Sequence, residues 1–141
     1  MRTAIFLLLV SVISCYAAEE KDTYYYPKAP SEIFLNAAKK CVEDLSYNSS
    51  IMDQIMQGKY IEEDKTLNVL ICAAVNTGYG NADGKLNVEK VVKELYPERQ
   101  DVWPIIEKCN LEQVTSTPLE TFKGIVVCLK NNLPFKIKFP M

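Results

Sequence analysis

Four cysteines follow an N-terminal apolar segment, and each lies in a stretch whose apolar residues recur at helical spacing: Cys41, Cys72, Cys109 and Cys128. Disulfides persist in oxidising compartments and are rare in the cytosol. Four cysteines behind a secretory signal therefore predict a small exported helical domain held by two disulfides. This feature excludes cytosolic chemistry, and it favours binding or carrying over catalysis.

Residues 1–17 have the pattern of a cleavable signal peptide. A single positive charge precedes an apolar run over residues 4–13, and small residues at Cys15 and Ala17 fit the cleavage pattern. The run is shorter than the roughly 20 residues that span a bilayer, so we expect no stable membrane insertion. A lipoprotein signal, with lipid on Cys15, is the competing interpretation. The rest of the chain, residues 18–141, has the length of one domain.

Charge and histidine content exclude several classes of function. The chain has 16 basic and 18 acidic residues, without the clustered basic residues of a nucleic-acid footprint. It has no histidine, which excludes a Ser-His-Asp or Cys-His catalytic unit, a histidine zinc site and a histidine pH switch. The cysteines also lack the close pairs of structural zinc sites. We expect neither an enzyme nor a bound metal or cofactor.

Apolar spacing predicts six short helices in an all-α domain. The predicted helices cover residues 33–45, 51–57, 62–75, 88–95, 102–109 and 118–129. Ser31 is the expected N-cap of the first helix, Gly58 stops the second, and Pro118 begins the last at a position that favours proline. Residues 19–30 and the C-terminal segment LPFKIKFPM contain prolines and are expected to be extended.

Two loops carry short motifs. A sequon makes Asn48 a candidate glycosylation site in an exposed loop. Residues 81–84 are similar to part of a calcium loop, but the first and last ligand positions hold Tyr79 and Lys90 where carboxylates are required. We interpret this second segment as a turn.

The cysteine spacing and several local stretches resemble the insect odorant-binding proteins, in particular the subgroup called Minus-C, which lacks one disulfide. The family's general pattern places further cysteines four residues before Cys72 and nine before Cys128, where this chain has Asn68 and Leu119. Both members of one bridge are therefore absent together, as loss of a pair would produce. The Gly58 turn, the loop DGKLN and the helix TFKGIVVCLKNNLP also resemble the family.

The resemblance implies six helices around a hydrophobic cavity, with disulfides Cys41–Cys72 and Cys109–Cys128. It implies a carrier, secreted into sensillar lymph, haemolymph or another fluid, that reversibly binds small hydrophobic molecules such as odorants, pheromones or fatty acids. Membrane chemoreceptors are a further class of partner, and the expected state is a monomer or weak dimer. The alternative is a secreted, disulfide-stabilised interaction protein with a filled core and no small-molecule ligand.

The residues expected to line the cavity lie on apolar helix faces and on the C-terminal segment, which would close it. They are Phe34, Ile55, Leu70, Leu95, Ile106, Phe122, Val126, Phe135 and Phe139. For each of them, packing in a filled core is the alternative.

Overall fold

A computed structural model describes residues 21–60, 63–113 and 115–140, so the predicted signal peptide and Cys15 lie outside the described residues. The elements in chain order are β1 (Asp22–Tyr25), α1 (Lys28–Asp44), α2 (Ser50–Met56), α3 (Asp64–Thr77), α4 (Val88–Leu95), the 3-10 helix η3 (Gln100–Val102), α5 (Trp103–Glu112), α6 (Pro118–Asn132) and β2 (Phe135–Lys138). The predicted all-α fold of six helices is confirmed, with a small two-stranded sheet added. None of the described helices is both long and apolar enough to cross a membrane.

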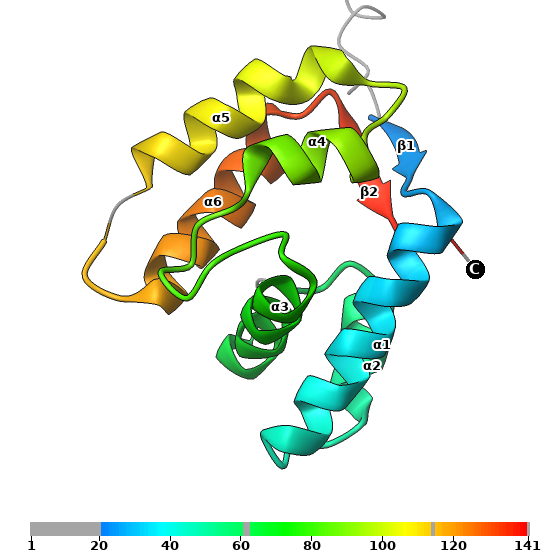
Figure 1. The fold of residues 1–141 in the computed structure, drawn as a ribbon, viewed down its shortest axis with the longest axis vertical. Coiled ribbons are helices and arrows are strands. Elements are labelled where there is room, and N and C mark those ends of the chain that lie inside the picture. Colours follow the sequence, from blue (N-terminus) through cyan, green and yellow to red (C-terminus); the bar gives the residue numbers. More distant parts are fainter. Residues whose placement is uncertain (1–20, 61–62, 114, 141) are drawn as a thin grey trace, which may run out of the picture.

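The helices form two halves. Figure 1 shows α1, α2 and α3 gathered in one half of the molecule and α4, α5 and α6 in the other. We call these the α1–α3 half and the α4–α6 half. Each half has its own cluster of buried apolar residues, and α6 also contributes Phe122 to the cluster of the α1–α3 half.

The first helix begins earlier than its apolar stripe predicts. α1 starts at Lys28, directly after the extended Pro27, and the predicted N-cap Ser31 lies inside its first turn. The Ser31 hydroxyl donates a hydrogen bond of 2.7 Å to the Pro27 carbonyl oxygen and is buried. The prediction of Ser31 as N-cap was therefore wrong. A serine hydroxyl can cap free N–H groups or bond the carbonyl four residues back, and the local sequence does not separate the two roles.

Side-chain caps fix where α4 and α6 begin. The Asn87 side chain accepts a hydrogen bond from the Lys90 amide, and the Thr117 hydroxyl accepts one from the Glu120 amide, each at 3.2 Å. Such caps satisfy amide groups that have no partner within the helix. Pro118 occupies the first position of α6, as predicted. The fixed start of α6 places Phe122 on the face that meets the α1–α3 half.

The two extended ends of the chain pair with each other. β1 and β2 form a parallel pair in which Asp22 lies opposite Phe135 and Tyr25 opposite Lys138. The Tyr24 hydroxyl also donates a hydrogen bond of 3.0 Å to the carbonyl oxygen of Leu95, at the end of α4. The sequence predicts that both segments are extended but not that they meet. In Figure 1 the small sheet lies between α1 and α4.

Each half contains one disulfide. Cys41–Cys72 joins α1 to α3, and Cys109–Cys128 joins α5 to α6, which is the pairing that the resemblance implies. The positions where the family would have a further bridge, Asn68 on α3 and Leu119 on α6, belong to different halves. Among the described residues, the two halves are therefore joined by the loop from α3 to α4, packing, hydrogen bonds and the exposed ion pair between Lys123 and Asp64 (3.9 Å), without a disulfide between them.

Candidate ligand-binding cavity

A cavity of about 350 Å³ lies between the two halves. Every described α-helix except α2 contributes apolar residues to its wall: Phe34, Leu70, Ala74, Val91, Leu95, Ile106, Phe122, Ile125, Val126 and Leu129. The C-terminal segment adds Leu133, Phe135, Ile137 and Phe139. The volume is at the small end of the range that ligand pockets occupy, roughly 300–1,000 Å³. It exceeds the roughly 30 Å³ that one water molecule occupies by a wide margin.

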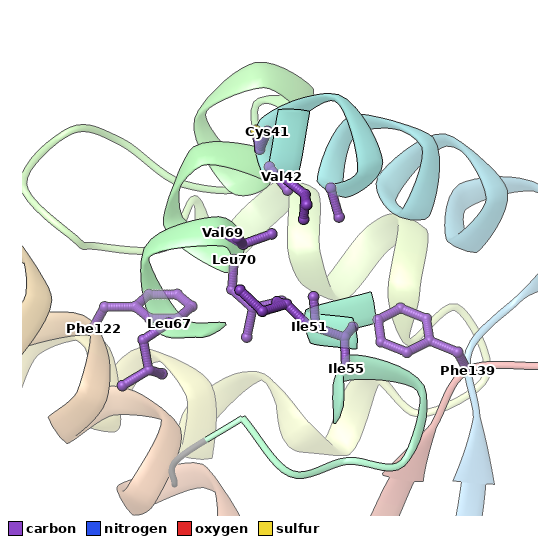
Figure 2. Packing of buried hydrophobic residues seen from close by; sticks show 11 residues of the cluster. Cys41, Val42, Ile51, Ile55, Leu67, Val69, Leu70, Phe122 and Phe139 are labelled. Atoms are coloured by element: carbon purple, nitrogen blue, oxygen red, sulfur yellow. The ribbon is translucent and has the colours of Figure 1, made fainter. Parts of the chain in front are cut away.

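The structure places eight of the nine predicted cavity residues on this wall, namely Phe34, Leu70, Leu95, Ile106, Phe122, Val126, Phe135 and Phe139. Ile55 is absent from the wall. It is fully buried in the cluster of the α1–α3 half, where Figure 2 shows it beside Ile51 on α2. An apolar stripe marks the buried face of a helix, but it does not show whether that face meets another helix or a void. Contact of the other eight with a ligand stays a prediction.

Aromatic rings fix the C-terminal segment against the helical body. The Phe139 ring stacks on Phe34 of α1 with centroids 5.9 Å apart, and it meets the Tyr26 ring edge to face at 5.5 Å. The Phe135 ring lies 5.0 Å from that of Tyr24. Such pairs contribute roughly 0.5–1.5 kcal/mol each beyond their burial. The segment is thus part of the cavity wall in this structure.

A pair of tyrosine hydroxyls is the main polar feature inside the wall. The hydroxyls of Tyr26 and Tyr96 lie 2.9 Å apart and share a hydrogen bond. Burial raises the pKa of both tyrosines, so both rings are neutral at physiological pH. Two hydroxyls carry two hydrogens, and their mutual bond uses one of them. The pair can therefore donate the other to an acceptor oxygen of a ligand.

Sequence reasoning missed this pair. Tyr26 ends a run of three tyrosines that we interpreted only as part of an extended arm, and Tyr96 lies just after a predicted helix. A run of large aromatic residues in an otherwise polar arm is a signal that the arm is buried somewhere. It does not show which partner the arm will meet.

The exposed residues of the wall mark where the cavity meets solvent. They are Lys21, Gln57, Gly58, Lys130, Lys136 and Lys138. The charged residues in the described lining are all lysines.

The structure describes both loops that carry short motifs, residues 81–84 and the segment with Asn48. The Asn81 side-chain oxygen accepts hydrogen bonds from the amides of Asp83 (3.0 Å) and Lys85 (3.2 Å), which makes residues 81–84 a turn. The described residues contain no group of three or more His, Cys, Asp or Glu side chains placed to hold a metal ion. Asn48 is exposed, and its side-chain oxygen accepts a hydrogen bond of 2.9 Å from the Ser50 amide. Its glycosylation stays a prediction.

Comparisons with known proteins agree with this fold. No curated protein sequence matches the chain significantly. The structure is similar to that of odorant-binding protein dmelOBP28a from Drosophila melanogaster, with a TM-score of 0.60 and 16% sequence identity over 74% of this chain and 92% of that one. At this identity the likeness shows a shared fold. The model of the PBP/GOBP family matches residues 25–132, which include all six helices, and the chain therefore belongs to the PBP/GOBP family.

Proposed function

We propose that the protein is a secreted carrier that reversibly encloses small hydrophobic molecules in the cavity between its two halves. The observation that carries this proposal is the cavity of about 350 Å³ with its largely apolar wall. Membership of the PBP/GOBP family supports the same role. A carrier needs no reactive group, and we propose no enzymatic activity.

The affinity follows from the apolar area that a ligand buries. Each buried methylene contributes about 0.8 kcal/mol, so a chain of about ten contributes roughly 8 kcal/mol. Ordering of the ligand and of the wall offsets part of this gain, and the expected dissociation constants are roughly micromolar. An apolar wall recognises shape and area, so we expect selectivity among neutral ligands to be broad.

The sequence also supports proposals about the subgroup of the family, the place where the protein acts and its partners. The four cysteines and the paired absence at Asn68 and Leu119 support placement in the Minus-C subgroup. The predicted signal peptide and the two disulfides support secretion into an oxidising fluid such as sensillar lymph or haemolymph. We propose membrane chemoreceptors as partners that receive the ligand, and a monomer or weak dimer as the working state.

Displacement of a fluorescent apolar probe tests the carrier role. The mature protein is expected to bind the probe at one saturable site, and decanol is expected to displace it. The Val126→Phe variant should weaken probe binding at least tenfold, because Val126 lines the cavity and the added ring takes up part of its volume. Val127→Phe is the matched control, since Val127 is the next residue on α6 and is 37% exposed.

The outcomes separate the two candidate functions. Saturable binding that is lost in Val126→Phe and kept in Val127→Phe supports a carrier. Absence of saturable binding in the unmodified protein contradicts it and favours the interaction protein with a filled core.

A further inference from the structure

The loop between α3 and α4 contains an aspartate that is followed by a glycine. Asp83–Gly84 is the single Asp-Gly pair of the sequence, which has no Asn-Gly pair. Asp83 is exposed, whereas Gly84 is buried. Because glycine has no Cβ, its backbone nitrogen can approach the carboxyl group of the preceding residue with little steric hindrance. This pair is therefore the point of the chain where the backbone can rearrange most readily.

The rearrangement converts aspartate into isoaspartate and needs no reactant besides water. The backbone nitrogen of Gly84 attacks Cγ of the protonated Asp83 carboxyl group. The new N–Cγ bond closes a five-membered succinimide ring, a Cγ–O bond breaks, and one water molecule leaves with the amide proton. Water then opens the ring at the former main-chain carbonyl carbon, which becomes a free carboxylate. The chain now runs through Cβ and Cγ of Asp83, and its mass is unchanged.

The folded loop restrains this reaction through Asn81. The Gly84 amide donates a hydrogen bond of 3.1 Å to the Asn81 carbonyl oxygen, so the attacking nitrogen is held in the turn. The Asn81 side-chain oxygen accepts the amides of Asp83 and Lys85. The Asn81 amide donates a hydrogen bond of 2.9 Å to the Lys85 carbonyl oxygen. Asparagine side chains close turns in this way. Attack therefore requires that the turn first opens.

An isoaspartate does not fit the closed turn. A Cβ on Gly84 would collide with the carbonyl oxygen of Pro118, the first residue of α6, so the two backbones are in close contact. Isoaspartate lengthens the backbone by one methylene carbon, about 1.5 Å, directly before Gly84. The packing leaves no space for a methyl group on Gly84. The added length must therefore displace Gly84 from α6 or break the hydrogen bonds of Asn81.

We propose that Asp83 is a modification site at which isoaspartate forms spontaneously, at a rate set by opening of the Asn81 turn, and that its formation detaches the loop from the start of α6. When a turn opens and closes faster than the chemical step, the reaction rate tracks the population of the open form. The modified form thus accumulates with the age of the protein. This inference concerns the covalent chain and goes beyond the proposed carrier function.

Peptide mapping after incubation of the mature protein at 37 °C and pH 7.4 tests the modification. Over several weeks the peptide that contains Asp83 should split into two forms of identical mass. The new form should accept a methyl group from an isoaspartyl methyltransferase, which acts on its free carboxylate. Asp101 is the internal control, because it is exposed and is followed by Val102, whose β-branched side chain hinders attack. Its peptide should stay unchanged.

A pair of matched variants tests the restraint by the turn. Asn81→Ala removes the oxygen that accepts two amides, and it should speed conversion at Asp83 roughly tenfold, as the net loss of about two hydrogen bonds implies. Asn48→Ala is the control. The Asn48 side chain accepts an amide two residues on in the same way, but it lies in another loop. This variant should convert at the rate of the unmodified protein.

Urea titration of the separated forms tests detachment of the loop. The isoaspartate form should unfold at a lower urea concentration than the freshly prepared protein. Asp83→Glu is the control for ageing itself, since its longer side chain would have to close a six-membered ring. After the same incubation it should show no conversion and an unchanged unfolding midpoint.

The possible results decide each part of the inference. If Asp83 does not convert, or if Asn81→Ala and the unmodified protein convert at equal rates, the assignment of Asp83 as a site controlled by the turn is overturned. An unchanged unfolding midpoint in the isoaspartate form overturns detachment of the loop. These measurements do not involve ligand, so a failure here is distinguishable from a failure of the carrier function in probe binding.

Discussion

The two halves of the molecule are each closed by a disulfide, whereas the described contacts between them are noncovalent. Cys41–Cys72 ties α1 to α3, and Cys109–Cys128 ties α5 to α6. Between the halves lie the cavity, the side chain of Phe122 and one exposed ion pair. An exposed ion pair contributes at most about 1 kcal/mol. The boundary between the halves, which no described disulfide crosses, thus coincides with the proposed binding site.

The interiors of the two halves also differ. The buried cluster of the α1–α3 half is largely aliphatic, with Phe122 and Phe139 reaching it from α6 and from the C-terminal segment (Figure 2). The cluster of the α4–α6 half includes the buried tyrosines Tyr79 and Tyr96. The buried members of the α4–α6 cluster thus include phenol side chains, which the buried members of the other cluster lack.

Removing either disulfide should have the largest effect on stability. The bridges join residues separated by 31 and 19 positions, and chain-entropy estimates give about 3.7 and about 3.2 kcal/mol. Cys41→Ala with Cys72→Ala, and Cys109→Ala with Cys128→Ala, are therefore expected to lower the free energy of unfolding by similar amounts in urea titrations. If either double variant unfolds with an unchanged free energy, the two halves do not depend equally on their disulfides.

The next effect concerns the loop that connects the halves. Gly84 has φ 83°, and a Cβ there would collide with the carbonyl oxygen of Pro118 at the start of α6. Gly84→Ala should lower the free energy of unfolding by about 3 kcal/mol, from backbone strain plus this collision. Gly78→Ala is the control, since φ is 81° but the near neighbour is the flexible Lys90 side chain. Gly78→Ala should lower the free energy of unfolding by about 1 kcal/mol. An equal decrease in both variants would contradict close packing at Gly84.

High pH should loosen the α4–α6 half first. Burial and, next, the nearby carboxylate of Glu94 raise the pKa of Tyr79 to about 12 from an ordinary value of 10.0. A group whose pKa is higher in the folded protein than in the unfolded chain stabilises the folded state fully at pH values below its unfolded-state pKa. This contribution is lost as the pH rises through its folded-state pKa. Stability should therefore fall between about pH 10 and pH 12, as measured by urea titration. Tyr79→Phe should flatten this fall, and an unchanged slope would show that Tyr79 does not cause it.

A disulfide between the halves should slow their separation. Asn68→Cys with Leu119→Cys places thiols where the family would have its further bridge. When this bridge forms, amide exchange in α3 and α6 should slow roughly tenfold, and the association rate of the probe should fall. The same variant after reduction is the control. Equal exchange rates in the oxidised and reduced forms would show that the halves do not open at this boundary.

Mild acid should have the smallest effect. The described cavity wall contains no histidine, aspartate or glutamate, the side chains whose ordinary pKa values lie closest to the range from pH 7 to 5.5. Decanol affinity should therefore change less than twofold across this range in probe displacement. A tenfold loss would mean that a carboxylate outside the wall controls the cavity.

Local signals predicted most of the fold. Apolar spacing located all six helices, since each buries one face. The largest shift in a helix start was at α1, where Ser31 bonds backward rather than capping. The pairing of β1 with β2 was not predictable in this way. It joins segments at opposite ends of the chain, and neither TYYY nor FKIK indicates its partner.

The candidate site was predictable in part, because local signals show which residues are buried but not which partners they meet. The aromatic residues of the C-terminal segment pointed to a docking tail, because Phe135 and Phe139 have no helix of their own to bury them. Ile55 shows the limit, since burial on α2 is equally compatible with a core and with a cavity wall. The Tyr26–Tyr96 pair depends on how distant segments of the chain meet, so no single segment encodes it.

Calorimetric titration of decanol into the mature protein at several temperatures tests the central claim most directly. A cavity that encloses an apolar guest predicts one site per chain, roughly micromolar affinity and a negative heat-capacity change, because apolar surface leaves water. Titration without saturable heat, or with a heat-capacity change near zero, would contradict enclosure of the ligand between the two halves.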